Sequence, residues 1–154
     1  MGQGTGTDLV SEEIEHAFPR LKLSGYSITS PSSPDYNCIA WAASDSERWW
    51  EPDPFGLYYW PEEAPPRVTL EAFIAAFATR RYQPCENSHI ESGFEKVAVY
   101  VDAEGRPTHA ARQLPNGLWT SKLGKSQDIE HELEGVTGSV YGSVAQFLKR
   151  PINE

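Results

Sequence analysis

The fold expected of this chain depends on the stretch Asp35-Tyr36-Asn37-Cys38-Ile39-Ala40-Trp41-Ala42-Ala43. A Ser/Pro-rich segment over residues 31–34 precedes it, and prolines disfavour helical backbone there. Asp35 has the side chain of a helix N-cap, which would place Cys38 in the first helical turn. Small residues follow at helical spacing, so we expect a core helix that runs to about Trp49.

Composition predicts one globular domain. The chain has 154 residues, of which 39% are hydrophobic and 12% aromatic. A chain of this size can bury a real core without help from disulfides. We therefore expect a single domain over residues 8–152, preceded by a flexible Gly/Thr-rich N-terminus at residues 1–7.

The charge balance excludes one large class of partner. Thirteen basic and 22 acidic residues give a net charge of −9. A nucleic-acid binder needs clustered Lys and Arg to neutralise phosphates, so we expect no nucleic-acid partner. No segment has the ~20 apolar residues of a membrane span, and no basic start precedes an apolar run. We expect a cytoplasmic protein with no membrane association.

Helical patterns dominate the first half of the chain. Residues 11–18 predict a short helix that Pro19 ends or bends. Thr69 is the expected N-cap of a second helix, which runs from Leu70 to about Arg80. Its apolar residues recur at helical spacing and should face the core, namely Leu70, Phe73, Ile74 and Phe77.

An aromatic loop, residues 49–60, lies between the core helix that contains Cys38 and the helix that begins at Leu70. Residues 49–61 hold six aromatic residues and three prolines, so they cannot form one regular element. Two interpretations stay open: the loop covers the core with its own rings, or it lines a ligand groove. In the second case the substrate-binding candidates are Trp50, Tyr59 and Trp60.

The second half is rich in predicted strands. Alternating residues and the hairpin signal Pro115-Asn116-Gly117 indicate an antiparallel meander. We expect strands at residues 94–102, 107–114, 118–123 and 141–149, with a short helix over residues 128–133. The expected fold class is α+β, with N-terminal helices packed on an antiparallel β-meander.

Cys38 and His109 are the candidate catalytic pair. A thiol near a helix N-terminus lies close to the positive end of the helix dipole, which favours the thiolate. The free N–H groups there can stabilise an oxyanion, and a histidine on a neighbouring strand can pair with the thiol. Asn37 could add an oxyanion donor or could only cap the helix, and both roles stay open.

The third member of such a site has two candidates. Ser121 lies on the strand after His109, on a position that could orient the imidazole. Asp128 could reach in from the following turn, and we place it first because a carboxylate stabilises an imidazolium better than a hydroxyl does. Arg112 follows the histidine on its strand and could recognise a substrate carboxylate, although strand arginines are commonly just exposed.

The segments Asp35-Tyr36-Asn37-Cys38 and Pro107-Thr108-His109-Ala110-Ala111 resemble the papain-like superfamily in its compact bacterial form, the NlpC-type and CHAP-type peptidases and amidases. The likeness covers about residues 34–124, in order of elements. It implies a papain-like fold and a thiolate–imidazolium pair that attacks an amide through an acyl-enzyme, with a peptide or protein as substrate. Residues 94–131 are also similar to a family of small uncharacterised bacterial proteins, which implies no function.

The alternative is a non-catalytic binding or immunity-type module on a hydrolase-like fold. In that case the aromatic loop and the negative charge would form the surface for a basic partner. A metal site is not expected, because the four histidines are scattered and Cys85 with His89 would need two more ligands. We expect no cofactor, and the sequence leaves the oligomeric state open.

Overall fold

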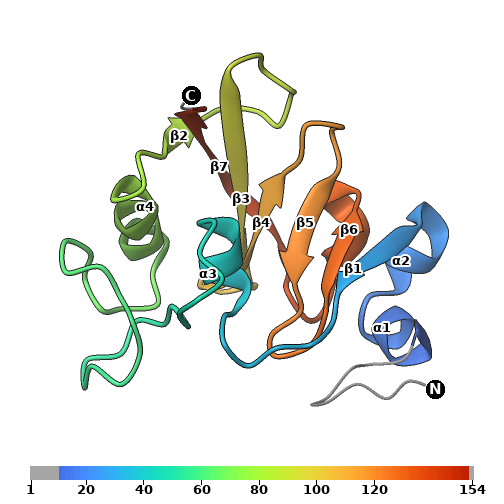
Figure 1. Cartoon of the computed structure of the whole chain (residues 1–154), viewed down its shortest axis with the longest axis horizontal. Helices are drawn as coiled ribbons and strands as arrows, with labels where there is room; N and C mark the ends of the chain where they lie inside the picture. Colours follow the sequence, from blue (N-terminus) through green and yellow to red (C-terminus); the bar gives the residue numbers. More distant parts are fainter. Residues whose placement is uncertain (1–10, 153–154) are drawn as a thin grey trace.

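An antiparallel sheet of seven strands, in the order β1-β6-β5-β4-β3-β7-β2, organises the computed structural model, which describes residues 11–152 (Figure 1). The strands are β1 Tyr26–Ser30, β2 Gln83–Cys85, β3 Phe94–Val101, β4 Pro107–Gln113, β5 Trp119–Lys122, β6 Asp128–His131 and β7 Ser143–Pro151. The predicted α+β class is confirmed. The expected flexible N-terminus at residues 1–7 lies outside the described residues.

Helices are few and short. They are α1 Ser11–Ala17, α2 Pro19–Ser24, α3 Cys38–Ala42, α4 Leu70–Ala78 and a 3₁₀ turn, η1 Leu133–Val136. Pro19 does not simply end α1, because it is the first residue of α2, where its missing N–H costs nothing. Within residues 11–152 no helix is long and apolar enough to cross a membrane.

The predicted meander is confirmed as β3, β4 and β5. The helix expected at residues 128–133 is wrong: residues 128–131 form β6, which pairs with β5 through Lys122↔Asp128 and Ser121↔Ile129. A four-residue segment with one apolar residue has no period of its own, so sheet pairing decides its conformation. The edge strands β1 and β2 also escaped prediction, and β2 has only three residues.

Helix α3 differs from its prediction at both ends. Asn37, not Asp35, is the N-cap, and its side-chain oxygen accepts a hydrogen bond from Ala40 N at 3.2 Å. Cys38 is therefore the first helical residue. The helix ends at Ala42, and Ser44 has a left-handed backbone, with φ of 67°, which turns the chain away toward the aromatic loop.

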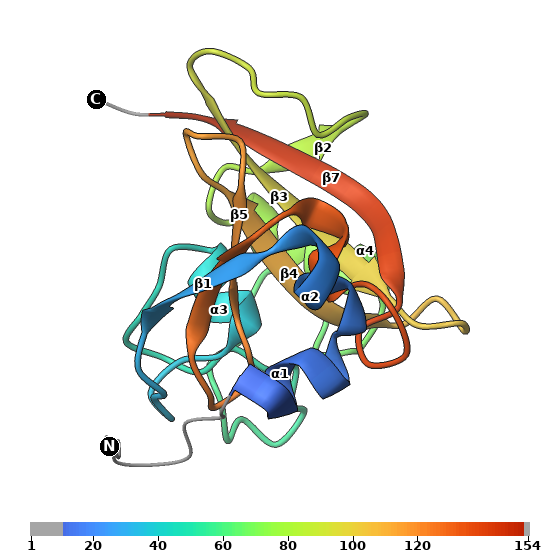
Figure 2. The same cartoon turned by 90° about the vertical axis from the view of Figure 1, so that its right-hand side faces the viewer.

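The sheet separates two hydrophobic cores (Figures 1 and 2). On one face, α3 and α4 pack against residues such as Val97, Val99 and Ala110. On the other face, α1, α2 and η1 cover Ala98 and Ala111, their neighbours in the strands. Because successive strand residues point to opposite faces, strands β3, β4 and β7 contribute to both cores.

Helix α4 follows its prediction closely. The Thr69 hydroxyl caps it by accepting from Ala72 N at 3.1 Å, as expected. Phe73 and Phe77 are buried in the first core, while Leu70 and Ile74 are half-buried beside them. The helix contacts β2 and thereby closes the α3 side of the sheet.

Gly142 should be the most sensitive glycine of the sheet. A Cβ atom there would lie 1.9 Å from Val101 O, and the backbone has a positive φ of 79°. We expect Gly142→Ala to lower the free energy of unfolding in urea by about 3 kcal/mol or more. Gly56→Ala is the control, since Gly56 has a similar φ but open space around it, and should cost about 1 kcal/mol. Equal losses would contradict this assignment.

Candidate functional site

Cys38 lies at the start of α3, against strand β4. The residue is half-buried, and the backbone N–H of Ala110 forms a hydrogen bond with its sulfur. Burial is the main influence on the thiol and raises its pKa to about 11, although Ala110 and the more distant Lys122 act in the opposite direction. This direction is opposite to the predicted stabilisation of the thiolate. A helix of five residues has too small a dipole to outweigh desolvation.

His109 belongs to a buried chain of polar side chains. Its Nε2 lies 2.8 Å from Ser121 Oγ, and Ser121 Oγ lies 2.7 Å from His131 Nε2. His131 Nδ1 is 2.6 Å from the carbonyl oxygen of Glu132. The ring of Tyr141 stacks on His109 with 3.8 Å between centroids. The contact between His109 and Ser121 agrees with the role predicted for Ser121.

The chain of acceptors fixes the proton positions. A carbonyl oxygen only accepts, so His131 Nδ1 carries a proton and His131 Nε2 accepts one from the Ser121 hydroxyl. Ser121 then accepts from His109 Nε2–H. His109 Nδ1 is left as an unprotonated nitrogen, and it is buried without a hydrogen-bond partner. Desolvation keeps both rings neutral: it lowers the pKa of His131 to about 4 and that of His109 well below its ordinary value.

The predicted pair reaches β4 from opposite faces of the sheet. His109 is paired with Tyr100 and points to the α1–α2 side, whereas Ala110, on which Cys38 packs, points to α3. Within the described part of the chain, no hydrogen bond joins the thiol to the imidazole. The strand alternation explains this, because a shift of one residue changes the face.

Asp128, the first choice for the third catalytic residue, has a structural role. Asp128 lies on the α3 side of the sheet, away from His109, and its Oδ2 accepts from the Tyr36 hydroxyl at 2.9 Å. Placing it as the third catalytic residue was wrong, since its register with Lys122 turns it to the other face. Burial raises the pKa of its carboxyl.

Asn37 and Arg112 are also engaged. The Asn37 amide donates to Trp50 O at 2.7 Å, and its oxygen accepts from Trp50 N at 3.1 Å as well as from the helix. This favours the capping role over the oxyanion role. Arg112 Nε donates to Trp41 O at 3.3 Å and its guanidinium lies over the Trp41 ring, so it is a packed residue and not an exposed one.

The aromatic loop is an ordered structure with an inner and an outer side. Its two arms run side by side, since Glu51 N donates to Tyr59 O at 3.0 Å and Tyr59 N to Trp49 O at 3.1 Å. Trp50 and Tyr59 turn inward and meet edge to face, 4.9 Å between centroids. Trp50 is fully buried and donates to Asp45 at 2.9 Å. It is a core residue, and its prediction as a substrate contact was wrong.

Trp60 also packs inward, only partly exposed. Its ring lies 5.1 Å from that of Phe73 in α4, and its Nε1 donates to Pro65 O at 2.9 Å. Tyr59 is half-buried and carries the Arg48 guanidinium 3.7 Å above its ring. Of the three aromatic residues predicted to bind substrate, none points freely to solvent.

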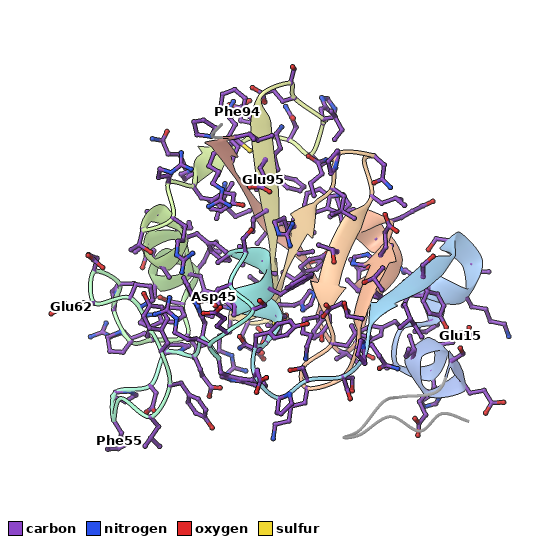
Figure 3. All side chains as sticks on the ribbon, in the orientation of Figure 1. Glu15, Asp45, Phe55, Glu62, Phe94 and Glu95 are labelled. Atoms are coloured by element: carbon purple, nitrogen blue, oxygen red, sulfur yellow. The ribbon has the colours of Figure 1, made fainter. Side chains whose placement is uncertain are left out.

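The exposed apolar residues of the loop are at its tip. Phe55 is 85% exposed, Leu57 76% and Tyr58 47%, and Figure 3 shows Phe55 at the outer end of the loop. Asp53 fixes this tip, because its carboxylate accepts from Phe55 N at 2.9 Å and from Leu57 N at 3.0 Å. The sequence analysis did not single out these residues, although an Asp two residues before an exposed turn is a signal for it.

The charge around this tip is negative. Residues 45–63 contain six Asp or Glu and a single basic residue, Arg48. Asp45 is held by Arg48 and Arg80 at 3.0 and 3.5 Å. The remaining five acids give the segment that carries the exposed apolar tip a net negative charge.

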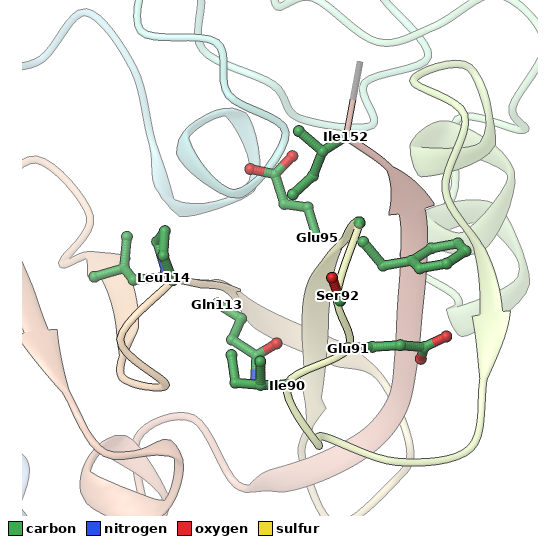
Figure 4. A pocket seen from close by; sticks show the side chains of 10 residues that line it. Ile90, Glu91, Ser92, Glu95, Gln113, Leu114 and Ile152 are labelled. Carbon is green, nitrogen blue, oxygen red and sulfur yellow. The ribbon is translucent and has the colours of Figure 1, made fainter. Parts of the chain in front are cut away.

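A separate hollow lies beside Phe94 and Glu95, away from Phe55 at the tip of the aromatic loop (Figures 3 and 4). Its lining includes Ile90, Leu114, Gln113 and Ile152, and it encloses about 200 Å³. Small-molecule sites usually offer roughly 300–1,000 Å³, so this hollow suits no more than one side chain. No group of three His, Cys, Asp or Glu within residues 11–152 is placed to hold a metal ion.

These features define an α+β protein whose seven-stranded antiparallel sheet has an ordered aromatic loop on its α3 side and a buried polar network on its α1–α2 side. Residues 27–149 match a family model described as "Domain of unknown function (DUF7689)", and the chain belongs to that family. The match begins after α1 and α2, so it covers the sheet, the loop and both members of the predicted pair. No curated protein and no solved structure matches the chain.

The raised thiol pKa predicts slow alkylation of Cys38. In a Cys85→Ala chain, iodoacetamide should modify Cys38 more slowly at pH 7–8 than a free thiol, with a rate that climbs toward pH 11. Mass spectrometry of timed samples gives the rate, and a Cys38→Ala chain reports Cys85 as the comparison. Rapid modification of Cys38 at pH 6–7 would instead indicate a thiolate.

The buried histidines predict loss of stability in acid. The pKa of His131 is about 4 in the folded chain against an ordinary 6.5, so the unfolded chain binds more protons between these values. Neutral His131 therefore contributes about 3 kcal/mol to the free energy of unfolding above pH 6.5, and this contribution is lost as the pH falls toward 4. Urea titrations at pH 7 and pH 4 should show this loss, and His131→Gln should reduce the pH dependence. An unchanged dependence in that variant would contradict the assignment.

Proposed function

We propose that this protein is a non-catalytic binding module that captures a basic protein partner through the aromatic loop, residues 49–60. The supporting observation is the exposure of Phe55, Leu57 and Tyr58 on a loop that internal hydrogen bonds hold in one conformation. Neighbouring large apolar side chains that stay exposed on an ordered loop commonly mark an interaction surface.

The loop is suited to binding because it is already organised. Each of these apolar side chains could contribute roughly 1.5–3 kcal/mol when a partner covers it. The ordering cost is small, since Asp53 fixes the tip and Asn37 fixes the base at Trp50. A flexible loop with the same residues would lose much of this gain to conformational entropy.

The surrounding carboxylates select the sign of the partner. Six acidic residues lie within residues 45–63, and the whole chain carries −9. This field attracts a partner with Lys or Arg around an apolar patch and repels an acidic one. The affinity should therefore fall when salt screens the charges.

Synthetic peptides can test the proposal without a known partner. A labelled alternating Lys-Leu peptide should bind the full chain in fluorescence anisotropy, whereas alternating Lys-Ser and Glu-Leu peptides should bind at least tenfold more weakly. The double variant Phe55→Ala/Leu57→Ala should lose at least tenfold in affinity for Lys-Leu. Leu23→Ala is the matched control, because Leu23 is 89% exposed on α2, far from the loop along the chain. Equal affinity of the double variant and the control would overturn the proposal.

A cysteine hydrolase is the second candidate, supported by one specific arrangement. The Cys38 sulfur accepts a hydrogen bond from the N–H of Ala110, which is the residue after His109. The Nδ1 atom of His109 has no hydrogen-bond partner among residues 11–152 and could accept a proton, while Ser121 orients the ring through Nε2. Strands β4 and β5 pair only at Arg112↔Thr120 and Gln113↔Trp119, so they separate near Ala110. Through that gap, neutral His109 would take the thiol proton as sulfur attacks a peptide or other amide carbonyl, and it would give that proton to the amine as the C–N bond breaks. Water would then hydrolyse the thioester of the acyl-enzyme, which releases the acid and restores the thiol.

This second function has its own test. A peptidyl vinyl sulfone should modify Cys38 in the Cys85→Ala chain, and His109→Ala should slow that reaction at least a hundredfold. Peptide mapping identifies the modified residue. Modification at the same rate with and without His109 would leave no basis for a hydrolase, while the binding proposal would be unaffected.

A further inference from the structure

We infer that Trp49, Tyr58 and Glu51 form a binding site for an organic cation, the side chain of a Lys or Arg on the partner. The inference rests on the proposed binding function and specifies which part of the loop receives the positive charge. None of these three residues was a candidate from the sequence.

The geometry of the loop places the two rings together on its outer side. Glu51 N and Tyr59 N tie the two arms to each other, while the Trp50 and Tyr59 rings turn inward. Their sequence neighbours Trp49 and Tyr58 therefore lie next to each other outside. The ring centroids are 6.4 Å apart with an angle of 40° between the planes.

This spacing suits a cation shared by two rings. A cation attracts an aromatic face when it lies within about 6 Å of the centroid, and Trp and Tyr are the strongest such rings. Two centroids 6.4 Å apart leave positions that satisfy this limit for both at once. Tyr58 is exposed and Trp49 is half-buried, so solvent and a partner can reach the pair.

Glu51 supplies the negative charge that such a site needs. Its carboxylate accepts a hydrogen bond from Trp49 Nε1 at 2.9 Å, which orients both side chains. Glu51 is exposed, and its other oxygen has no protein partner among residues 11–152. A Lys ammonium or an Arg guanidinium could bind that oxygen while its charge lies against the rings.

The two inner rings of the loop already hold a cation, whereas Trp49 and Tyr58 hold none from residues 11–152. Arg48 lies 3.7 Å from the Tyr59 centroid and Arg80 5.1 Å from the Trp50 centroid. Rings outside the loop hold cations as well, namely Tyr36, Trp41, Tyr82 and Phe94. Over Trp49 and Tyr58, no cation lies within the described part of the chain.

A small cation can probe the site directly. Nα-acetyl-lysine methyl ester, which keeps the charged side-chain ammonium, is titrated into the full ¹⁵N-labelled chain. It should shift the Trp49 indole N–H signal in two-dimensional NMR until the site is saturated. The neutral isostere N-acetyl-norleucine methyl ester should shift it at least fivefold less. Trp49→Phe assigns the signal, and the signals of Trp41, Trp50 and Trp60 serve as internal references.

Substitutions separate the cation site from the fold of the loop. Tyr58→Phe keeps the ring and should retain lysine binding, whereas Tyr58→Leu and Glu51→Gln should each weaken it at least threefold. Glu86→Gln, which removes an exposed carboxylate outside residues 45–63, is the control for a general loss of negative charge, and it should change the affinity less than twofold. Equal behaviour of Tyr58→Leu and Tyr58→Phe, or equal shifts by both esters, would overturn the inference.

The two proposals fail in different ways. Retained binding of the Lys-Leu peptide, sensitive to Phe55→Ala/Leu57→Ala, would preserve the binding function even when the lysine ester produces no selective shift. Loss of both signals would refute the binding function together with the cation site.

Discussion

The side chain of Asn37 is the contact on which the arrangement of this protein depends. Its oxygen accepts from Ala40 N and Trp50 N, and its amide donates to Trp50 O, so one buried side chain both begins α3 and fixes the base of the aromatic loop. Because these groups are buried, the unpaired backbone N–H and C=O of Trp50 would each cost about 1–3 kcal/mol if Asn37 were lost. The placement of Cys38 on β4 and the direction of the loop thus share one origin.

The sheet then divides the polar chemistry between its two faces. Cys38, Tyr36 and Asp128 belong to the α3 side, while His109, Ser121 and His131 form a hydrogen-bonded chain under α1 and α2. Desolvation raises the pKa of the thiol and lowers the pKa values of the imidazoles, which disfavours the ion pair that a papain-like mechanism implies. The exposed side chains with a fixed orientation lie in the aromatic loop instead, and for this reason we propose binding as the first function and catalysis as the second.

The aromatic residues of the loop differ in role because adjacent residues point to opposite sides of each arm. Trp50 and Tyr59 fill the inner side and hold Arg80 and Arg48 over their rings. Trp49 and Tyr58 occupy the outer side without such a cation among the described residues, beside the carboxylate of Glu51. Cation–π contacts thus stabilise the inner side of the loop, and in our proposal the same type of contact binds the partner on the outer side.

Local sequence patterns were enough to predict the α+β class, helix α4 with its Thr69 cap, the hairpins of β3, β4 and β5, and Ser121 as a neighbour of His109. Each of these follows from local capping, turn residues or strand alternation, which act over a few residues. Contacts between distant segments were needed to establish that residues 128–131 are a strand, that Asn37 and not Asp35 begins α3, and that Trp50 is buried while Phe55 is exposed. The side of the sheet on which Cys38 packs against β4 also depends on tertiary contacts. These features depend on register and on contacts between distant segments, and a change of one residue in register reverses which side chains meet.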